Sequence, residues 1–91
     1  MLIRYLQKEF TEETGLVLQD GTEEDVLLAL DKIIVVYINH HFEKLLQVMY
    51  RMDVDEQKFS KALLKKRSSL EIAKLVISRE KQRIDFRKRY K

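Results

Sequence analysis

The fold is decided by the stretch from Thr22 to Met52, TEEDVLLALDKIIVVYINHHFEKLLQVMYRM. Its apolar residues recur at spacings of three and four from Val26 onward, which is the period of an α-helix. Thr22 is a favourable N-cap residue. The acidic residues at 23–25 follow it, and they stabilise the positive end of the helix dipole. The stretch therefore predicts a helix that begins at its first residue.

A rival interpretation comes from residues 32–38, KIIVVYI, which are rich in β-branched side chains and would suit a buried strand in another context. We favour the helix because the helical spacing continues on both sides without a turn signal. A helix over 22–52 would be about 45 Å long at 1.5 Å per residue. The sequence leaves open whether it is continuous or kinked near Asn39, since Asn is able to cap a new helix.

Three further helices are expected around this one. Apolar spacing predicts a first helix over about 2–13. The pattern that starts at Asp53, with a Glu three residues later, is a capping box and predicts a third helix over about 54–66. The same signal at Ser68 predicts a fourth helix from about residue 69 to the chain end. The predicted fold class is all-α, a three- to four-helix antiparallel bundle with a long central second helix.

The composition fits one folded domain over residues 1–91, with 45% hydrophobic residues, no cysteine, no proline and two glycines. The absence of cysteine excludes a disulfide framework and a thiolate metal site. The amino end lacks the apolar stretch and cleavage site of a signal peptide. The longest apolar run, VLLALDKIIVVYI, is shorter than the roughly 20 residues of a membrane span. We expect a soluble cytoplasmic protein that does not bind membranes.

Two stretches carry a family resemblance. FEKLLQVMYRMDVDEQKF, at 42–59, and IAKLVISREKQR, at 72–83, are similar to a group of small uncharacterised bacterial proteins. The resemblance implies a small, all-helical cytoplasmic protein. It implies no activity and no site residue, because the matching positions are core and capping residues.

The net charge of +3 hides a division along the chain. Residues 1–60 hold six Lys and Arg against twelve Asp and Glu, a net charge of −6. Residues 61–91 hold twelve Lys and Arg against three Asp and Glu, a net charge of +9. Such an asymmetry predicts a partner of opposite charge, either inside the molecule or outside it.

The basic tail supplies the candidate site. On a helical wheel, two arginines and two aromatic residues share one side of the last turns, which a nucleic acid would use for phosphate contact and base stacking. The candidate contact residues are Arg79, Arg83, Phe86, Arg87, Lys88, Arg89 and Tyr90. The alternative is that this stripe complements the acidic start of the second helix, or packs on a second copy. The sequence shows no helix-turn-helix glycine turn, zinc knuckle or aromatic RNA-binding motif.

Other candidate sites are weaker. Adjacent residues on a helix point about 100° apart, so His40 and His41 do not face one metal ion. Asp53 resembles the start of a calcium loop, but Lys58 stands where that loop needs glycine. No nucleophile–base–acid set is present. Met49, Tyr50 and Met52 would suit a groove for a partner helix, although methionines at helical spacing are more often core residues.

Together these features predict a non-catalytic helical module that binds another protein or itself. A homodimer is expected because a second helix longer than its neighbours would leave apolar surface uncovered. The alternative is a small nucleic-acid-binding protein that uses the basic C-terminal helix. We expect no cofactor, no metal and no small-molecule substrate.

Overall fold

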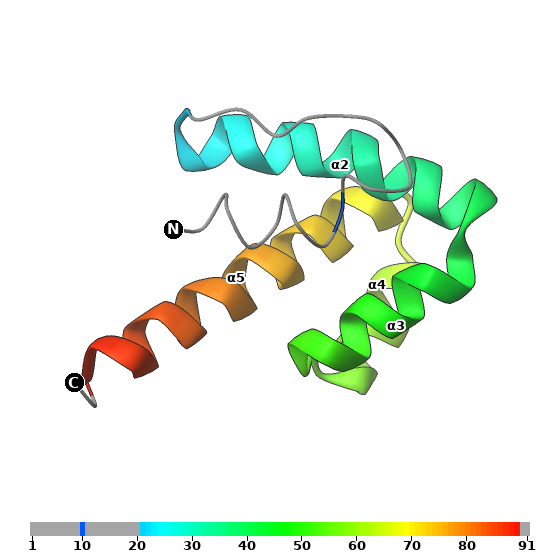
Figure 1. The fold of residues 1–91 in the computed structure, drawn as a ribbon. Helices are drawn as coiled ribbons and strands as arrows, with labels where there is room; N and C mark the ends of the chain where they lie inside the picture. The colour runs from blue at the N-terminus through cyan, green and yellow to red at the C-terminus, as the bar shows by residue number, and fades with distance from the viewer. Residues whose placement is uncertain (1–9, 11–20, 90–91) are drawn as a thin grey trace.

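The computed structural model describes Phe10 and residues 21–89, with only the backbone described at 85–89. From residue 21 to residue 89 the chain forms helices and no strands, as Figure 1 shows. The helices are α2 (Glu23–His40), α3 (Phe42–Met52), α4 (Glu56–Leu63) and α5 (Ser68–Arg89). The all-α prediction is confirmed for this part of the chain.

The first helix in this part, α2, begins as the sequence predicts. The Thr22 side chain accepts a hydrogen bond from the Asp25 N–H at 3.1 Å. The Asp25 carboxylate accepts one from the Thr22 N–H at 3.0 Å. This reciprocal capping box satisfies two N–H groups at the helix end that have no partner within the helix.

The helix predicted over 22–52 is not continuous, and of the two alternatives left open by the sequence, the interruption near Asn39 is the one observed. The chain leaves helical geometry at His41, where φ is −141° and ψ is 46°. The His41 N–H closes α2 on the Tyr37 carbonyl at 2.9 Å, and its own carbonyl accepts the first bond of α3 from Leu45 at 3.1 Å. The break lies two residues beyond Asn39. It redirects α3 beneath α2, where Figure 1 shows α3 running back towards the middle of the molecule.

The turn between α3 and α4 also differs from the prediction. Asp53 ends α3 in the left-handed conformation, with φ 59° and ψ 45°. Asp55 is the N-cap of α4, and its carboxylate accepts bonds from the N–H groups of Gln57 at 2.8 Å and Lys58 at 3.2 Å. The predicted cap at Asp53 is wrong because that residue is needed to terminate the preceding helix.

Later boundaries are closer to the prediction. Helix α4 ends at Leu63, three residues before the predicted end, and α5 begins at Ser68, one residue before the predicted start. The Ser69 hydroxyl donates a hydrogen bond to the Asp31 carboxylate of α2. The start of α5 is thereby tied to the middle of α2.

The central element is α5, and the expectation of a bundle around a long second helix is not confirmed. With 22 residues, α5 exceeds the 18 of α2, and it packs against α2, α3 and α4. Figure 1 shows α5 running diagonally with α2 on one side and α3 and α4 on the other. The core is formed by the apolar residues Phe10, Val26, Leu30, Ile33, Ile34, Tyr37, Leu45, Val48, Met49, Met52, Phe59, Ala62, Ile72, Ala73, Val76 and Ile77.

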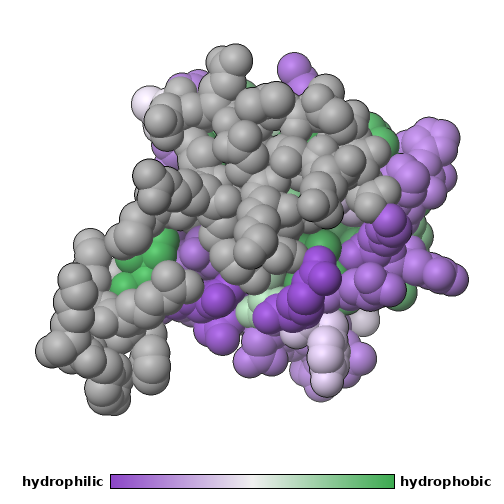
Figure 2. All heavy atoms as spheres, in the orientation of Figure 1, coloured by the Kyte–Doolittle hydropathy of each residue, from purple (hydrophilic) through white to green (hydrophobic). Residues whose placement is uncertain are grey.

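The predicted first helix, 2–13, lies outside the described residues except for Phe10. This residue is helical and fully buried, and its ring meets Tyr37 edge-on with ring centres 5.7 Å apart. No helix in the described part of the chain is long and apolar enough to cross a membrane. On the face shown in Figure 2, the described surface is mostly hydrophilic, with small apolar areas between.

Candidate interaction surfaces

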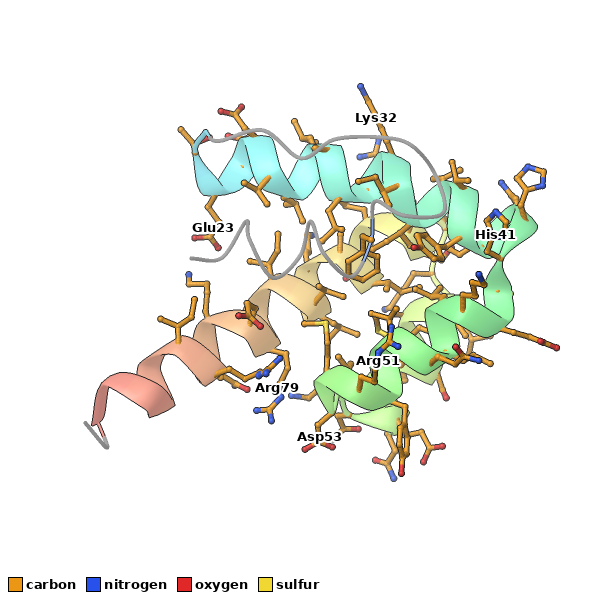
Figure 3. All side chains as sticks on the ribbon, in the orientation of Figure 1. Glu23, Lys32, His41, Arg51, Asp53 and Arg79 are labelled. Carbon is orange, nitrogen blue, oxygen red and sulfur yellow. The ribbon has the colours of Figure 1, made fainter. Side chains whose placement is uncertain are left out.

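Arg79, the first residue of the predicted tail site, forms contacts within the protein. Its Nε donates to the Met52 carbonyl at 3.0 Å, and its Nη2 lies 3.5 Å from the Asp53 carboxylate. Figure 3 shows Arg79 and Asp53 close together where α5 passes the end of α3. A guanidinium is suited to this role because its fixed fork of donors serves two acceptors at once. Arg79 therefore holds the α3–α4 turn against α5.

Arg83 likewise has an acidic neighbour on its own helix. Its Nη1 lies 3.4 Å from the carboxylate of Glu80, a residue that is only 1% exposed. The helical wheel places Glu80 within the apolar arc of α5, and the structure confirms that position. A carboxylate so deeply buried requires a charged or hydrogen-bonding partner, so the Arg83 contact has a structural function.

The rest of the predicted tail site is only partly described. The backbone of residues 86–89 continues α5, and the side chains there lie outside the described part, as does Tyr90. The structure thus brings Arg79 and Arg83 into internal contacts. Nucleic-acid binding by Phe86, Arg87, Lys88, Arg89 and Tyr90 stays a prediction.

One contact joins the acidic and basic halves of the chain. The Lys81 Nζ lies 3.0 and 3.2 Å from the two carboxylate oxygens of Glu23, so the last half of α5 meets the start of α2. Glu23 is labelled in Figure 3, on the side of α2 that faces α5. Both side chains are about half exposed, and such pairs contribute about 0–1 kcal/mol. The pair orients the two helices more than it stabilises the fold.

A groove of about 1080 Å³ runs along α3 and the start of α4. Its apolar side chains come from both helices and from the turn between them. They are Leu46, Met49, Tyr50, Val54 and Phe59. Its polar side chains are those of Gln47, Arg51, Asp53, Asp55, Glu56 and Gln57. We call this site the α3–α4 groove.

Two residues of the α3–α4 groove are exposed although they are large and apolar. Tyr50 is 86% exposed and Leu46 is 45% exposed. They lie four residues apart, so they share one face of α3, while Leu45, Val48 and Met52 face the core. Of the three residues proposed from sequence to line a groove, Tyr50 is exposed, whereas Met49 and Met52 are buried.

A second candidate surface consists of exposed side chains on α4 and on the turn that follows it. It contains five exposed cations, none of which forms an ion pair within the described residues. They are Lys58, Lys61, Lys65, Lys66 and Arg67. We call them the α4 basic surface. Sequence reasoning missed this cluster because it followed the denser charge of the tail, although the run KALLKKR at 61–67 was visible.

The two histidines at the helix break do not form a metal site. Their ring centres lie 6.5 Å apart at an interplanar angle of 61°, and His41 also meets the Tyr37 ring at 6.1 Å. Among the residues that the structure describes, no group of three His, Asp or Glu side chains is placed to hold a metal ion. The histidine rings pack at the junction of α2 and α3.

Comparison with known proteins gives no further guide to the site. No protein-family model matches the chain, and no curated protein or solved structure matches it either.

Proposed function

We propose that the chain is a non-catalytic module that binds another protein through the α3–α4 groove. The observation that carries the proposal is the exposure of Tyr50, at 86%, beside Leu46 in a groove whose other apolar side chains are largely buried. A single exposed leucine is ordinary, but an exposed aromatic residue in an apolar groove is typical of a binding surface. Tyrosine often contributes much of the binding energy at protein interfaces.

The shape of the groove favours a helical partner. Exposed apolar residues four apart match the spacing by which an amphipathic helix is bound in a groove. The volume of about 1080 Å³ lies at the upper limit of small-molecule pockets, which are usually about 300–1,000 Å³. The groove is lined by both apolar and polar side chains, as protein interfaces are.

Two of the three acidic residues of the groove, Asp53 and Asp55, have structural partners. The Asp53 carboxylate lies 3.5 Å from Arg79, and that of Asp55 accepts two backbone hydrogen bonds at the start of α4. A general acid or base requires a carboxyl that is available to the substrate. The groove therefore supports a binding function that uses its apolar side chains.

Self-association through the same groove is the other form of this proposal. The sequence predicted a homodimer from a second helix longer than its neighbours, and the break at His41 removes that reason. The exposed pair of Leu46 and Tyr50 supplies a new one, because two copies would cover it mutually. The antiparallel bundle over 1–91 and the cytoplasmic location remain predictions within the same proposal.

Matched substitutions test this function. Tyr50→Asp places a charge in the groove, and Leu28→Asp places one at an exposed leucine of α2 that is 51% exposed and outside the groove. Partners are captured from host extract on each tagged full-length variant, then purified and titrated. We expect a partner that binds the parent and the Leu28 variant equally. Its affinity for the Tyr50 variant should fall more than tenfold, which is about 1.4 kcal/mol.

Two outcomes would contradict the proposal. One is that every captured protein binds the Tyr50 and Leu28 variants equally well. The other is that the Tyr50 variant loses its cooperative thermal transition, which would show that the exposed ring supports the fold. Sedimentation of the pure parent and the Tyr50 variant tests the self-associating form, for which only the parent should dimerise.

A further inference from the structure

The α4 basic surface contains five cations within ten residues of sequence, at 58–67, and all five side chains are exposed. The ion pairs of the described residues involve other cations, such as Lys74, Arg79 and Lys81. Like charges repel one another, and no acidic side chain within the described part forms an ion pair with these five. The charge of this surface therefore favours the binding of a polyanion.

Glu56, at the start of α4, lies on a different side of the helix from the two lysines of α4. At 100° per residue, Lys58 and Lys61 lie about 60° apart, while Glu56 lies at least about 140° from each of them. Of the two aspartates before it, Asp53 pairs with Arg79 and Asp55 caps α4. Lys58 and Lys61 can therefore contact an anion while the Glu56 carboxylate points away from it.

The connection between α3 and α4 has the length of the turn in a helix-turn-helix unit. Three residues, 53–55, join the helices, and the first of them adopts the left-handed conformation that glycine usually supplies. Asp53 takes this conformation because short polar side chains tolerate it. In the sequence, the lack of a glycine turn was an argument against nucleic-acid binding. The structure shows that Asp53 forms such a turn without glycine.

The helices of this unit bury their inner faces and leave the outer face of α4 free. Val48 and Met52 before the turn, and Phe59 and Ala62 after it, belong to the core. In helix-turn-helix proteins the second helix lies in the major groove of DNA and flanking side chains contact the phosphates. Here the cations lie on the second helix and on the turn that follows it.

We propose that the α4 basic surface binds the phosphates of duplex DNA. The major groove of B-form DNA admits a helix, whereas that of A-form RNA is too narrow for side chains to read. An anionic membrane fits less well, because a helix lying on a membrane requires an apolar face. The apolar residues Phe59 and Ala62 of α4 are 6% and 5% exposed, and Leu64, at 88%, is a single exposed leucine beside the cations.

The proposal predicts a steep dependence on salt. Neutralising five phosphates gives a slope of about −4.5 in log affinity against log salt. Raising the salt from about 50 to about 200 mM should then weaken binding roughly 500-fold. DNA binding by the α4 basic surface does not depend on protein binding by the α3–α4 groove, so each can be tested separately.

The test compares two triple variants of the full chain with equal loss of charge. One carries Lys65→Gln, Lys66→Gln and Arg67→Gln in the α4 basic surface. The other carries Arg87→Gln, Lys88→Gln and Arg89→Gln in the predicted tail site. Anisotropy of a short fluorescent DNA duplex is measured for both variants and for the parent over the same salt range. The first variant should lose about three units of salt slope, and the second should retain the slope of the parent.

Several results would overturn the proposal. One is that the parent fails to bind the duplex at the lowest salt. Another is that both variants lose affinity equally, which would indicate an effect of total charge. A loss confined to the tail variant would assign binding to the predicted tail site instead. Binding to vesicles that contain phosphatidylserine, without binding to DNA, would assign the surface to membranes.

Discussion

The α2–α5 pair and the α3–α4 pair differ in how many of their side chains form contacts within the protein. Between α2 and α5, apolar residues meet in the core, Ser69 binds Asp31, and Lys81 binds Glu23. On α3 and α4, the inner faces are buried, but Leu46 and Tyr50 of α3 are exposed, and Lys58 and Lys61 of α4 are exposed without an ion pair in the described part of the chain. The first pair acts as a scaffold, and the second presents the surface.

This difference has an energetic meaning. Burying apolar surface contributes about 25 cal/mol per Å², so a large side chain left in water forgoes that stabilisation. Tyr50 is such a side chain, and a partner that covered it would recover the difference on binding. Leu28 and Val35 of α2 are also exposed, at 51% and 42%, so the clearest difference between the two helix pairs is the ring of Tyr50, which is 86% exposed.

The largest effect is expected in the scaffold. Leu30 of α2 is fully buried, so Leu30→Ala should lower the free energy of unfolding by about 2–5 kcal/mol through lost contacts and a cavity. The same change at the half-exposed Leu46 of α3 should cost less than about 0.5 kcal/mol. Urea denaturation measures both, and equal losses would erase the distinction between the two regions.

A smaller effect is expected at the α3–α4 turn. Asp53 has φ 59°, so Asp53→Val should be roughly 1–3 kcal/mol less stable than Asp53→Gly, since a β-branched residue is strained there. Both substitutions remove the contact with Arg79, which makes them a matched pair. Thermal midpoints of the two proteins provide the measurement, and midpoints that coincide would show that the turn is not held in this conformation.

The N-caps of the two regions should respond alike. Thr22→Ala in the scaffold and Asp55→Ala in the surface pair each remove capping hydrogen bonds, and each should cost about 0.5–2 kcal/mol. Asp55→Ser keeps a capping oxygen and should retain most of the stability. Denaturation of the three variants tests this, and an unaffected Asp55→Ala protein would argue against the observed start of α4.

The smallest effect is expected for the ion pair between Lys81 and Glu23. Their coupling should amount to about 0–1 kcal/mol, because both side chains are about half exposed and screened by salt. A double-mutant cycle with Lys81→Gln and Glu23→Gln isolates this term. A coupling above about 2 kcal/mol would mean that charge, more than apolar packing, holds α2 to α5.

Much of the scaffold could be predicted from the sequence. Periodicity predicted helices in both elements, and Thr22 identified the start of α2. These features depend on local spacing and local hydrogen bonds, which a sequence shows directly. The position of α5 as the central helix could not be predicted, because it depends on how the helices are arranged.

The surface pair was predicted less well because its features arise from tertiary structure. No glycine or proline marks the break at His41, and the apolar spacing continues through it. Two aspartates, at 53 and 55, are both suitable caps, and the sequence does not show which one ends α3. Charge counting pointed to the tail, since it does not reveal that Arg79 and Arg83 have internal partners while the lysines of α4 have none in the described part.

The most direct test of the account is the stability of the double variant Leu46→Ala, Tyr50→Ala, measured by urea denaturation of the full chain. If the outer face of α3 is free for a partner, the free energy of unfolding should change by less than about 1 kcal/mol, as for surface substitutions. A loss above about 2 kcal/mol would show that this face is packed within the protein, and it would contradict the division into scaffold and surface.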